Sequence, residues 1–248
     1  MCIHSPANVS RYTRQLPLIG ELGQEKLTSS HICIAGVGGL GSPIALYLAA
    51  AGIGTLSIID CDTVSITNLN RQILHTTSDL KRAKVDSGAE KLRDLNPDIV
   101  IRTYHEKITQ EMLSTIACEA NLVIDAVDNY QSRYILNEFC VKHKIPFLHG
   151  AVQGFTGQMM FIVPHKTACL CCFLPSCETA HTPPVIGTTA GIIGVMQANE
   201  AIKYITNMKD ESIGSLILWD GATLTLEKCT IEKNPECPVC GNTRTASK

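Results

Sequence analysis

Residues 31–41 read HICIAGVGGLG, a short apolar strand that leads directly into a glycine-rich turn. A helical pattern follows the turn over Ser42–Ala51, Gly52 ends it, and a second apolar stretch covers Thr55–Ile59. That stretch runs into Asp60, about 20 residues past the glycines, which is the spacing of a nucleotide-binding strand–helix–strand unit. The pattern therefore predicts two neighbouring parallel strands with a ligand site at the turn between them.

The glycine-rich turn is a predicted phosphate site. Backbone N–H groups are exposed by its four glycines, Gly36, Gly38, Gly39 and Gly41. The helix that follows presents the positive end of its dipole, so an anion is favoured there. Asp60 is placed to accept hydrogen bonds from the hydroxyls of a ribose. The fingerprint leaves the nucleotide open, with NAD as its usual ligand.

The segment after Asp60 favours a triphosphate over a dinucleotide. It is a polar and charged run, where an NAD enzyme needs an apolar slot for adenine, and it carries Asn68, Arg71 and Gln72. Lys84 follows inside the next helical pattern. Arg71 and Lys84 together would neutralise a triphosphate; the alternative is that both are solvated surface charges. We therefore expect ATP, with these side chains at the phosphates.

Further along the chain, apolar strands alternate with helical patterns. The expected strands are 99–104, 122–125 and 146–149, with helices at 110–119 and 131–144. Antiparallel strands are then expected at 158–163, 216–219 and 223–228, with a helix at 192–206. We predict an α/β fold with a Rossmann-like doubly wound sheet, parallel in its N-terminal part and continued by antiparallel strands.

The chain divides into an arm and one domain. Residues 1–27 are expected to form an N-terminal helical arm, and residues 28–248 a single domain. Within it, residues 28–150 are the nucleotide-binding part, and residues 151–248 hold the mixed sheet, a crossover loop and a metal site. The loop, residues 174–189, is proline-rich and without periodicity, as long functional loops often are.

Two Cys-x-x-Cys pairs predict a zinc site. They are Cys169 with Cys172 and Cys237 with Cys240. Two such pairs complete a tetrahedral four-thiolate site with no open position, so the zinc is expected to be structural. Redox dithiols or disulfides are the alternative. Cys171, between the first two, is expected to be spare.

The composition of the chain indicates its cellular location and which classes of partner are not expected. The net charge of −2 gives no electrostatic footprint for nucleic acid. No apolar run reaches transmembrane length, so no membrane partner is expected. The chain shows no secretion signal, and its 12 cysteines are better suited to a reducing compartment. We expect a cytoplasmic protein.

The motifs together resemble the ThiF/MoeB/HesA family, the sulfur-carrier-protein adenylyltransferases related to ubiquitin-activating enzymes. The resemblance covers the chain from about Ser10 to Gly241. It is carried by the two cysteine pairs, Lys84 and five further motifs: Arg11–Gln15 (RYTRQ), Gly36–Gly41 (GVGGLG), Asp60–Val64 (DCDTV), Asn68–Gln72 (NLNRQ) and Asp125–Asn129 (DAVDN).

The resemblance implies a reaction. A small ubiquitin-like sulfur-carrier protein ending in Gly-Gly would have its C-terminal carboxylate adenylated by ATP, with release of pyrophosphate. Asp128 follows a parallel strand, where ligands bind in such sheets, and would hold magnesium, with Asn129 beside it. Catalysis would then consist mainly of positioning and charge stabilisation.

Two further roles rest on the resemblance. Arg14 would reach from one protomer of a homodimer into the nucleotide site of the other. Cys177, in the crossover loop, would form a persulfide-linked or thioester intermediate. Its Cys-x-x-Ala half matches the family pattern, but His181–Pro184 replaces the expected Gly-Val continuation, so an unreactive loop cysteine is equally compatible.

The pathway stays open at this point. Gly154–Gln158 and Leu218–Gly221 favour a thiamine-type carrier mildly over a molybdopterin-type carrier. Because the chain ends soon after the second cysteine pair, sulfur is expected from a separate sulfurtransferase or cysteine desulfurase. The competing hypotheses are an NAD-dependent oxidoreductase, a related ATP-dependent enzyme modifying tRNA or a peptide, and a non-catalytic partner.

Overall fold

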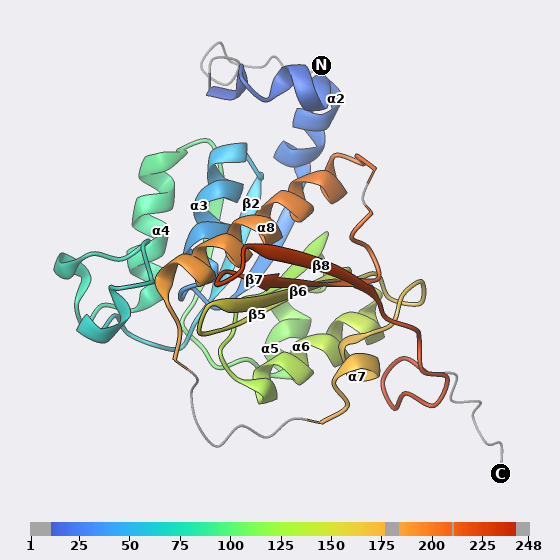
Figure 1. Ribbon diagram of the computed structural model, residues 1–248. Helices are drawn as coiled ribbons and strands as arrows, with labels where there is room; N and C mark the ends of the chain where they lie inside the picture. The colour runs from blue at the N-terminus through green and yellow to red at the C-terminus, as the bar shows by residue number, and fades with distance from the viewer. Residues whose placement is uncertain (1–10, 177–183, 210, 242–248) are drawn as a thin grey trace.

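The computed structural model describes residues 11–176, 184–209 and 211–241 (Figure 1). Its strands form one sheet in the order β3-β2-β1-β4-β5-β6-β7-β8. The parallel strands are β1 (His31–Ala35), β2 (Thr55–Ile59), β3 (Val100–Tyr104), β4 (Leu122–Asp125) and β5 (Phe147–Gln153). The antiparallel strands are β6 (Thr156–Ile162), β7 (Ser215–Asp220) and β8 (Thr225–Thr230). The predicted fold class is confirmed.

Helices cover both faces of the sheet. One layer consists of α2 (Leu16–Ser29), α3 (Gly41–Ala51), α4 (Lys84–Leu95) and α8 (Gly187–Ile205). The other consists of α5 (Gln110–Ile116), α6 (Tyr130–His143) and α7 (Leu170–Phe173). Each layer has its own apolar core against the sheet. None of the helices in the described ranges is long and apolar enough to span a membrane.

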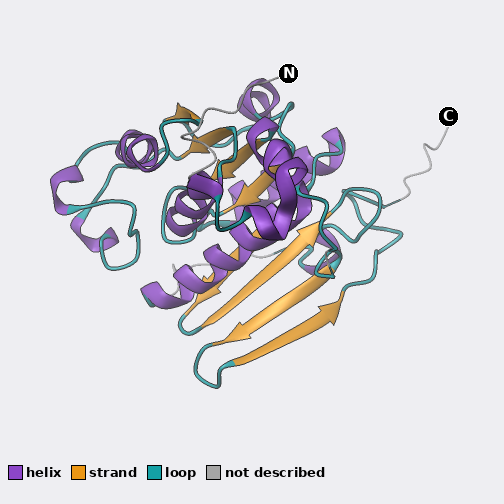
Figure 2. Cartoon of the chain, turned by 90° about the horizontal axis from the view of Figure 1, so that it is seen from above, coloured by secondary structure: helices purple, strands orange, loops and turns teal. Residues whose placement is uncertain are grey.

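The antiparallel end of the sheet reaches beyond the helices (Figure 2). Every residue of β8 is exposed, whereas β4 is buried throughout. The central strands read as continuous apolar runs because helices lie on both of their faces. A ligand site at the carboxyl ends of β1, β2 and β4 is therefore enclosed by the helices on one side and bordered by the antiparallel strands on the other.

The N-terminal arm is anchored on the end of α3. Gly52 caps this helix with a left-handed φ of 87°, and its N–H donates to Ala49 O and Leu48 O. A Cβ at Gly52 would lie 2.4 Å from Tyr12 Oη, so this position requires glycine for its backbone and for its packing. Tyr12 is buried, and its hydroxyl accepts a hydrogen bond from Asn96 Nδ2 at 2.9 Å.

Three element boundaries differ from the prediction by three residues or more, each because of a contact distant in sequence. α5 ends at Ile116, since the chain must turn to let Asn121 N–H donate to His31 O beside β1. β5 continues to Gln153 because it pairs with β6 as a hairpin. α8 begins at Gly187, where a Cβ would lie 2.5 Å from Asn70 O, so the crossover loop is shorter than predicted.

Candidate functional site

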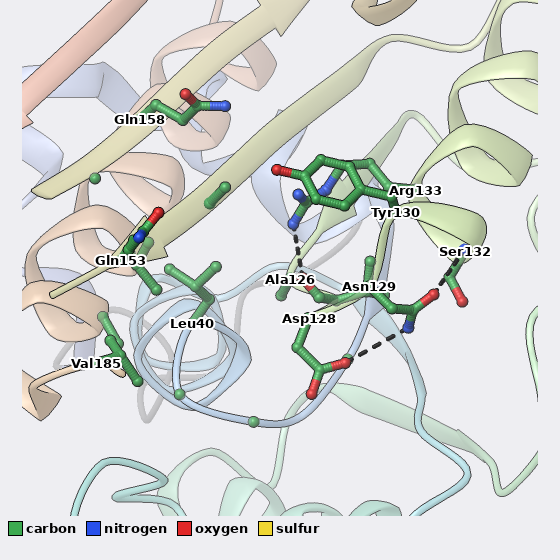
Figure 3. A pocket seen from close by; sticks show the side chains of 18 of the residues that line it. Leu40, Ala126, Asp128, Asn129, Tyr130, Ser132, Arg133, Gln153, Gln158 and Val185 are labelled. Atoms are coloured by element: carbon green, nitrogen blue, oxygen red, sulfur yellow. Dashed lines mark hydrogen bonds between the residues drawn. The ribbon is translucent and has the colours of Figure 1, made fainter. Parts of the chain in front are cut away.

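A cavity of about 1070 Å³ lies at the carboxyl ends of the parallel strands (Figure 3). Its walls come from the glycine turn after β1, from the segment after β2, from the start of α6, and from β5, β6 and β7. This is where open α/β sheets bind their ligands. This volume is just above the usual range of about 300–1000 Å³ for small-molecule pockets, so the cavity has room for a nucleotide and a second ligand.

The glycines of the turn have two different roles. Gly36, Gly38 and Gly39 line the cavity. Gly36 also has a left-handed φ of 97°, and a Cβ there would lie 2.5 Å from Ala126 O. Gly41 does not line the cavity; a Cβ at this position would lie 2.0 Å from Gly36 O, so Gly41 lets α3 begin directly behind the turn.

The peptide groups of Val37, inside this turn, are held from both sides. Val37 N donates to Asp60 Oδ2 at 2.8 Å, and Val37 O lies 3.0 Å from His75 Nε2. Asp60 also accepts from Asp62 N at 2.9 Å, and it lines the cavity. Because a carboxylate has about four acceptor positions, Asp60 can still accept from a ribose hydroxyl, as predicted from the sequence.

A series of hydrogen-bonded polar side chains lies behind the glycine turn. His75 Nδ1 contacts Ser87 Oγ at 2.9 Å, and Lys91 Nζ donates to Ser87 Oγ at 3.0 Å and to buried Asp79. Burial by itself would raise the pKa of Asp79, but hydrogen bonds from Lys91 and Thr76 hold that pKa below its usual value. Asp79 is therefore ionised and stabilises the loop that supports the glycine turn.

Replacing Asp79 by asparagine is expected to lower the free energy of unfolding at pH 7 by about 1–3 kcal/mol, because Lys91 loses a buried ionic partner. The depressed pKa means that the contribution of Asp79 is complete above its unfolded-state pKa of about 3.9 and is lost as the pH falls through the folded-state pKa. The difference between variant and wild type should therefore shrink below about pH 4. Urea unfolding at several pH values measures it. The exposed Asp94→Asn on α4 is the control; an equal effect in both variants would contradict the assignment.

The two predicted cations both reach the cavity. Lys84 opens α4 and is buried, with Nζ 2.9 Å from Asp62 Oδ2 and 4.0 Å from Asp60 Oδ2. Arg71 donates from Nη1 to Thr67 O at 3.0 Å. Both side chains line the cavity, so the alternative of two solvated surface charges is ruled out for Lys84.

Gln72 and Asn68, from the same segment, are placed differently. Gln72 is buried on the cavity wall, and its Oε1 has no hydrogen-bond partner among the described residues. A buried acceptor of this kind is costly unless a ligand or water supplies a donor. Asn68 does not line the cavity; its Oδ1 accepts from Ser65 N at 3.1 Å and shapes the 3₁₀ turn η1 (Ile66–Asn68) ahead of Arg71.

Asp128 and Asn129 lie just past β4 on the cavity wall (Figure 3). Asn129 caps α6, since its Oδ1 accepts from Ser132 N at 2.9 Å, and its Nδ2 donates to Asp128 Oδ1 at 3.5 Å. Asp128 itself is exposed to the cavity. A carboxylate with free lone pairs is a ligand that magnesium accepts, so Asp128 fits such an ion. Asn129 turns its amide NH₂ group toward Asp128, and its oxygen is used in the helix cap.

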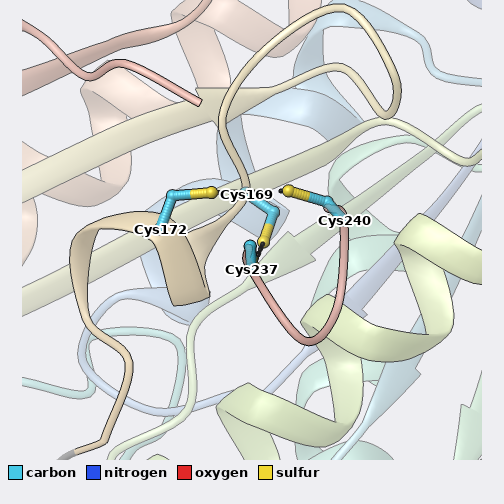
Figure 4. A group of neighbouring side chains, drawn as sticks. All are labelled: Cys169, Cys172, Cys237 and Cys240. Atoms are coloured by element: carbon cyan, nitrogen blue, oxygen red, sulfur yellow. Dashed lines mark hydrogen bonds between the residues drawn. The ribbon is translucent and has the colours of Figure 1, made fainter. Parts of the chain in front are cut away.

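Four cysteine sulfurs converge on the face of the sheet that α5, α6 and α7 cover (Figure 4). The Sγ atoms of Cys169, Cys172, Cys237 and Cys240 all lie within 4.8 Å of one another, and all four residues are free thiols. Cys169 and Cys237 are 3.6 Å apart, and Cys172 and Cys240 are 3.4 Å apart. Zinc at about 2.3 Å from four sulfurs separates neighbouring sulfurs by about 3.8 Å, so the cluster fits zinc.

The remaining predicted site residues lie elsewhere. Arg14 is exposed and does not line the cavity of its own chain. Cys177 lies outside the described residues. Cys171, the predicted spare cysteine, is buried and is not part of the four-sulfur cluster; its Sγ accepts from Asn137 Nδ2 at 3.5 Å.

The sequence analysis missed several cavity residues. Tyr130 and Arg133 on α6, Gln158 on β6 and Trp219 on β7 all line the cavity. The one signal for Arg133 was a charge eight residues after Asp125, to which it donates at 2.8 Å. Gln158 and Trp219 belong to the stretches Gly154–Gln158 and Leu218–Gly221, which indicated a type of carrier but no place in the cavity, because both residues reach the cavity only through strand pairing.

Comparisons with known proteins find relatives along nearly the whole chain. The ThiS adenylyltransferase of Escherichia coli, a sulfur carrier protein adenylyltransferase, is 38% identical over 238 residues, covering 93% of this chain and 94% of that protein. The SAMP-activating enzyme E1 of Haloferax volcanii is 35% identical over 241 residues, covering 94% and 89%. The adenylyltransferase and sulfurtransferase MOCS3 of Culex quinquefasciatus is 37% identical, covering 97% of this chain and 57% of that protein.

Solved structures share the fold. The crystal structure of Escherichia coli MccB with MccA-N7isoASN has a TM-score of 0.86 at 23% identity, covering 93% of this chain and 75% of that chain. At this identity the likeness concerns the fold alone. Among family descriptions, that of the ThiF family matches residues 12–239, which is most of the chain. Together with the relatives above 30% identity over nearly the whole length, this match shows that the chain belongs to the ThiF family.

Proposed function

We propose that this chain is an adenylyltransferase that uses ATP to adenylate the C-terminal glycine carboxylate of a small ubiquitin-like sulfur carrier. The observation that carries the proposal is the convergence of the glycine turn, buried Lys84, Arg71 and Asp128 on one cavity. The functions of the relatives support it: they are an adenylyltransferase of ThiS, an E1 that activates SAMP, and the adenylyltransferase and sulfurtransferase MOCS3.

In this reaction a carboxylate oxygen of the terminal glycine attacks the α-phosphorus of ATP. The bond from that phosphorus to the bridging oxygen breaks, and pyrophosphate leaves with the electron pair. The attacking carboxylate carries no proton, so no protein base is required. The work of the protein is to hold both reactants in line and to stabilise the negative charge that moves to the leaving group.

Different side chains would bind the phosphates, the ribose and the magnesium ion. Gly38 and Gly39 would bring backbone N–H groups to the phosphates, and Lys84 and Arg71 would place positive charge beside them. Asp60 would bind the ribose. Asp128 would hold a magnesium ion, which when bound spreads the charge of the pyrophosphate, and Asn129 would position the Asp128 carboxylate through its amide NH₂ group.

Three further parts of the proposal concern the assembly. The four cysteines would hold a structural zinc ion that ties the C-terminal segment to α7. Arg14, exposed on the N-terminal arm, would act in the cavity of a second copy, which requires a homodimer. Sulfur for the following thiocarboxylate step would come from a separate sulfurtransferase or cysteine desulfurase, in the cytoplasm, where thiols stay reduced.

ATP–pyrophosphate exchange tests the proposal. The probes are thiamine-type and molybdopterin-type carriers that end in Gly-Gly, each with a control that lacks the two terminal glycines. We expect exchange with at least one intact carrier and background exchange with every truncated control. Tight ATP binding without exchange would instead favour modification of tRNA or of a peptide, and an absence of ATP binding would overturn the proposal.

A further inference from the structure

A buried hydrogen-bond chain leads from the centre of the sheet to the cavity wall. Asp125, at the end of β4, accepts from Arg133 Nε at 2.8 Å and lies 2.7 Å from His149 Nδ1. His149 Nε2 lies 3.1 Å from Gln158 Nε2. The side chains of Asp125 and His149 are both 0% exposed, whereas Gln158 and Arg133 line the cavity (Figure 3).

The hydrogen-bond chain determines which of its side-chain atoms carry protons. Burial would raise the pKa of Asp125, but the charge of Arg133 and the bond to His149 hold that pKa below its usual value. Burial and the charge of Arg133 lower the pKa of His149. An ionised Asp125 only accepts, so the single proton of neutral His149 is on Nδ1, and Nε2 is a bare acceptor.

This proton arrangement sets the direction of the Gln158 amide. Only the NH₂ group of Gln158 can satisfy a bare imidazole nitrogen, because the amide oxygen would face another acceptor. With Nε2 committed to His149 at 3.1 Å, Oε1 remains as an acceptor on the cavity wall. Within the described ranges, no donor reaches this oxygen.

The position of Gln158 decides which substrate it meets. In the sheet, β1, β4 and β5 separate β2, which ends before Asp60, from β6, which carries Gln158. Neighbouring strands lie about 4.8 Å apart, so these two positions are about 19 Å apart. The glycine turn follows β1, and Asp128 follows β4. The groups proposed to hold ATP are thus on one half of the cavity, and Gln158 is on the other.

We propose that Gln158 binds the protein substrate, its side-chain oxygen accepting a hydrogen bond from a backbone N–H in the C-terminal tail of the carrier. His149 and Asp125 are positioning residues that hold the amide in this orientation. An extended tail offers one such donor at every residue, and glycines allow the close approach that this bond needs. The inference rests on the proposed adenylation of a carrier.

The enzyme-side test is Gln158→Leu, which keeps the approximate size of the side chain. We expect the KM for the carrier in pyrophosphate exchange to rise about tenfold, since the tail N–H loses its partner, while the KM for ATP stays at the wild-type value. A thermal melt checks that the variant is folded. An unchanged KM for the carrier, or an equal rise in both KM values, would overturn the inference.

The positioning role of His149 is tested by a separate double-mutant comparison. His149→Phe should raise the KM for the carrier alone, and adding Gln158→Leu should cause no further rise, because both changes remove the same bond. His143→Phe, at an exposed histidine on α6, is the matched control. Independent effects of the two substitutions would contradict the positioning role.

A substrate-side test uses only the wild-type protein and the Gln158→Leu variant. Carriers made by semisynthesis would have one tail peptide N–H at a time replaced by an ester oxygen. For wild-type protein, the ester at one position should raise the KM about tenfold, and for Gln158→Leu the same ester should have no effect. Equal ester effects in both proteins overturn the inference. Wild-type protein that exchanges pyrophosphate with no carrier overturns the proposed function instead.

Discussion

Replacing Lys84 by alanine is expected to lower kcat for adenylation about a thousandfold and to leave the melting temperature close to that of the wild type. Lys84 is 5% exposed, and its ammonium lies inside a cavity wall that also holds the glycine turn. A desolvated cation beside the phosphates stabilises developing negative charge far more than a solvated one does. Lys107, the other described lysine on the cavity wall, is exposed to solvent.

The fold should tolerate the loss of Lys84. Asp60 keeps its hydrogen bonds from the backbone N–H groups of Val37 and Asp62, and Asp62 has a side chain that is 60% exposed. The substitution also removes a cation from the N-terminus of α4, where the helix dipole disfavours it. Loss of activity can therefore be separated from loss of structure.

Single-turnover formation of the carrier adenylate measures the effect of Lys84→Ala directly. Lys142→Ala is the matched control, because Lys142 is an exposed helical lysine that is not on the wall of this cavity. We expect it to retain wild-type turnover. Turnover in Lys84→Ala within a few fold of the wild type would show that the cavity is not the site of the reaction.

Removal of zinc is expected to lower the melting temperature by more than about 10 °C, with little change in ATP affinity for the protein that remains folded. The cluster joins α7 to the segment around Cys237 and Cys240, which are 68 residues from their partners in the chain. Metal binding to such a site contributes directly to folding. Each kcal/mol lost shifts the midpoint by about 2–4 °C in a chain of this size.

Calorimetry of the protein before and after chelation, with metal analysis, measures this effect. Cys172→Ser should lose the bound zinc and show the same lowered midpoint. Cys171→Ser is a close control, since Cys171 is adjacent in sequence but outside the cluster, and it should keep one zinc per chain. A chelated protein that melts at the holo temperature would contradict a structural role of the metal.

The strand–helix–strand unit could be predicted closely because its information is local. The predicted strand Thr55–Ile59 matches β2 residue for residue, and Gly52 caps α3 as predicted. Apolar periodicity acts within a few residues, and so does the need for glycine at specific φ values. Both can therefore be recognised in a single sequence. The end of α5 and the start of α8 were predicted less well, because contacts with β1 and with Asn70 determine them.

The residues of the candidate site also fall into those that the sequence predicts and those that the tertiary structure decides. Predicted nucleotide residues such as Arg71, Lys84 and Asp128 share one cavity, because each follows or faces the carboxyl end of a parallel strand. Gly41 and Asn68 belong to the same motifs but do not line it; they shape the turns on which the lining residues stand. A motif states which residues occur together, whereas their geometry determines which of them meet the ligand.

Sequence patterns alone therefore predicted the α/β class, the glycine turn, the two cations on the cavity wall and the four thiols that converge. Gln158, His149 and Arg133 acquired a role only when the strands paired. His149 reaches Asp125 and Gln158 across β4, β5 and β6, and no spacing along the chain encodes that juxtaposition. The physical reason is that side-chain direction follows local periodicity, whereas the register between strands is set by the packing of the whole sheet.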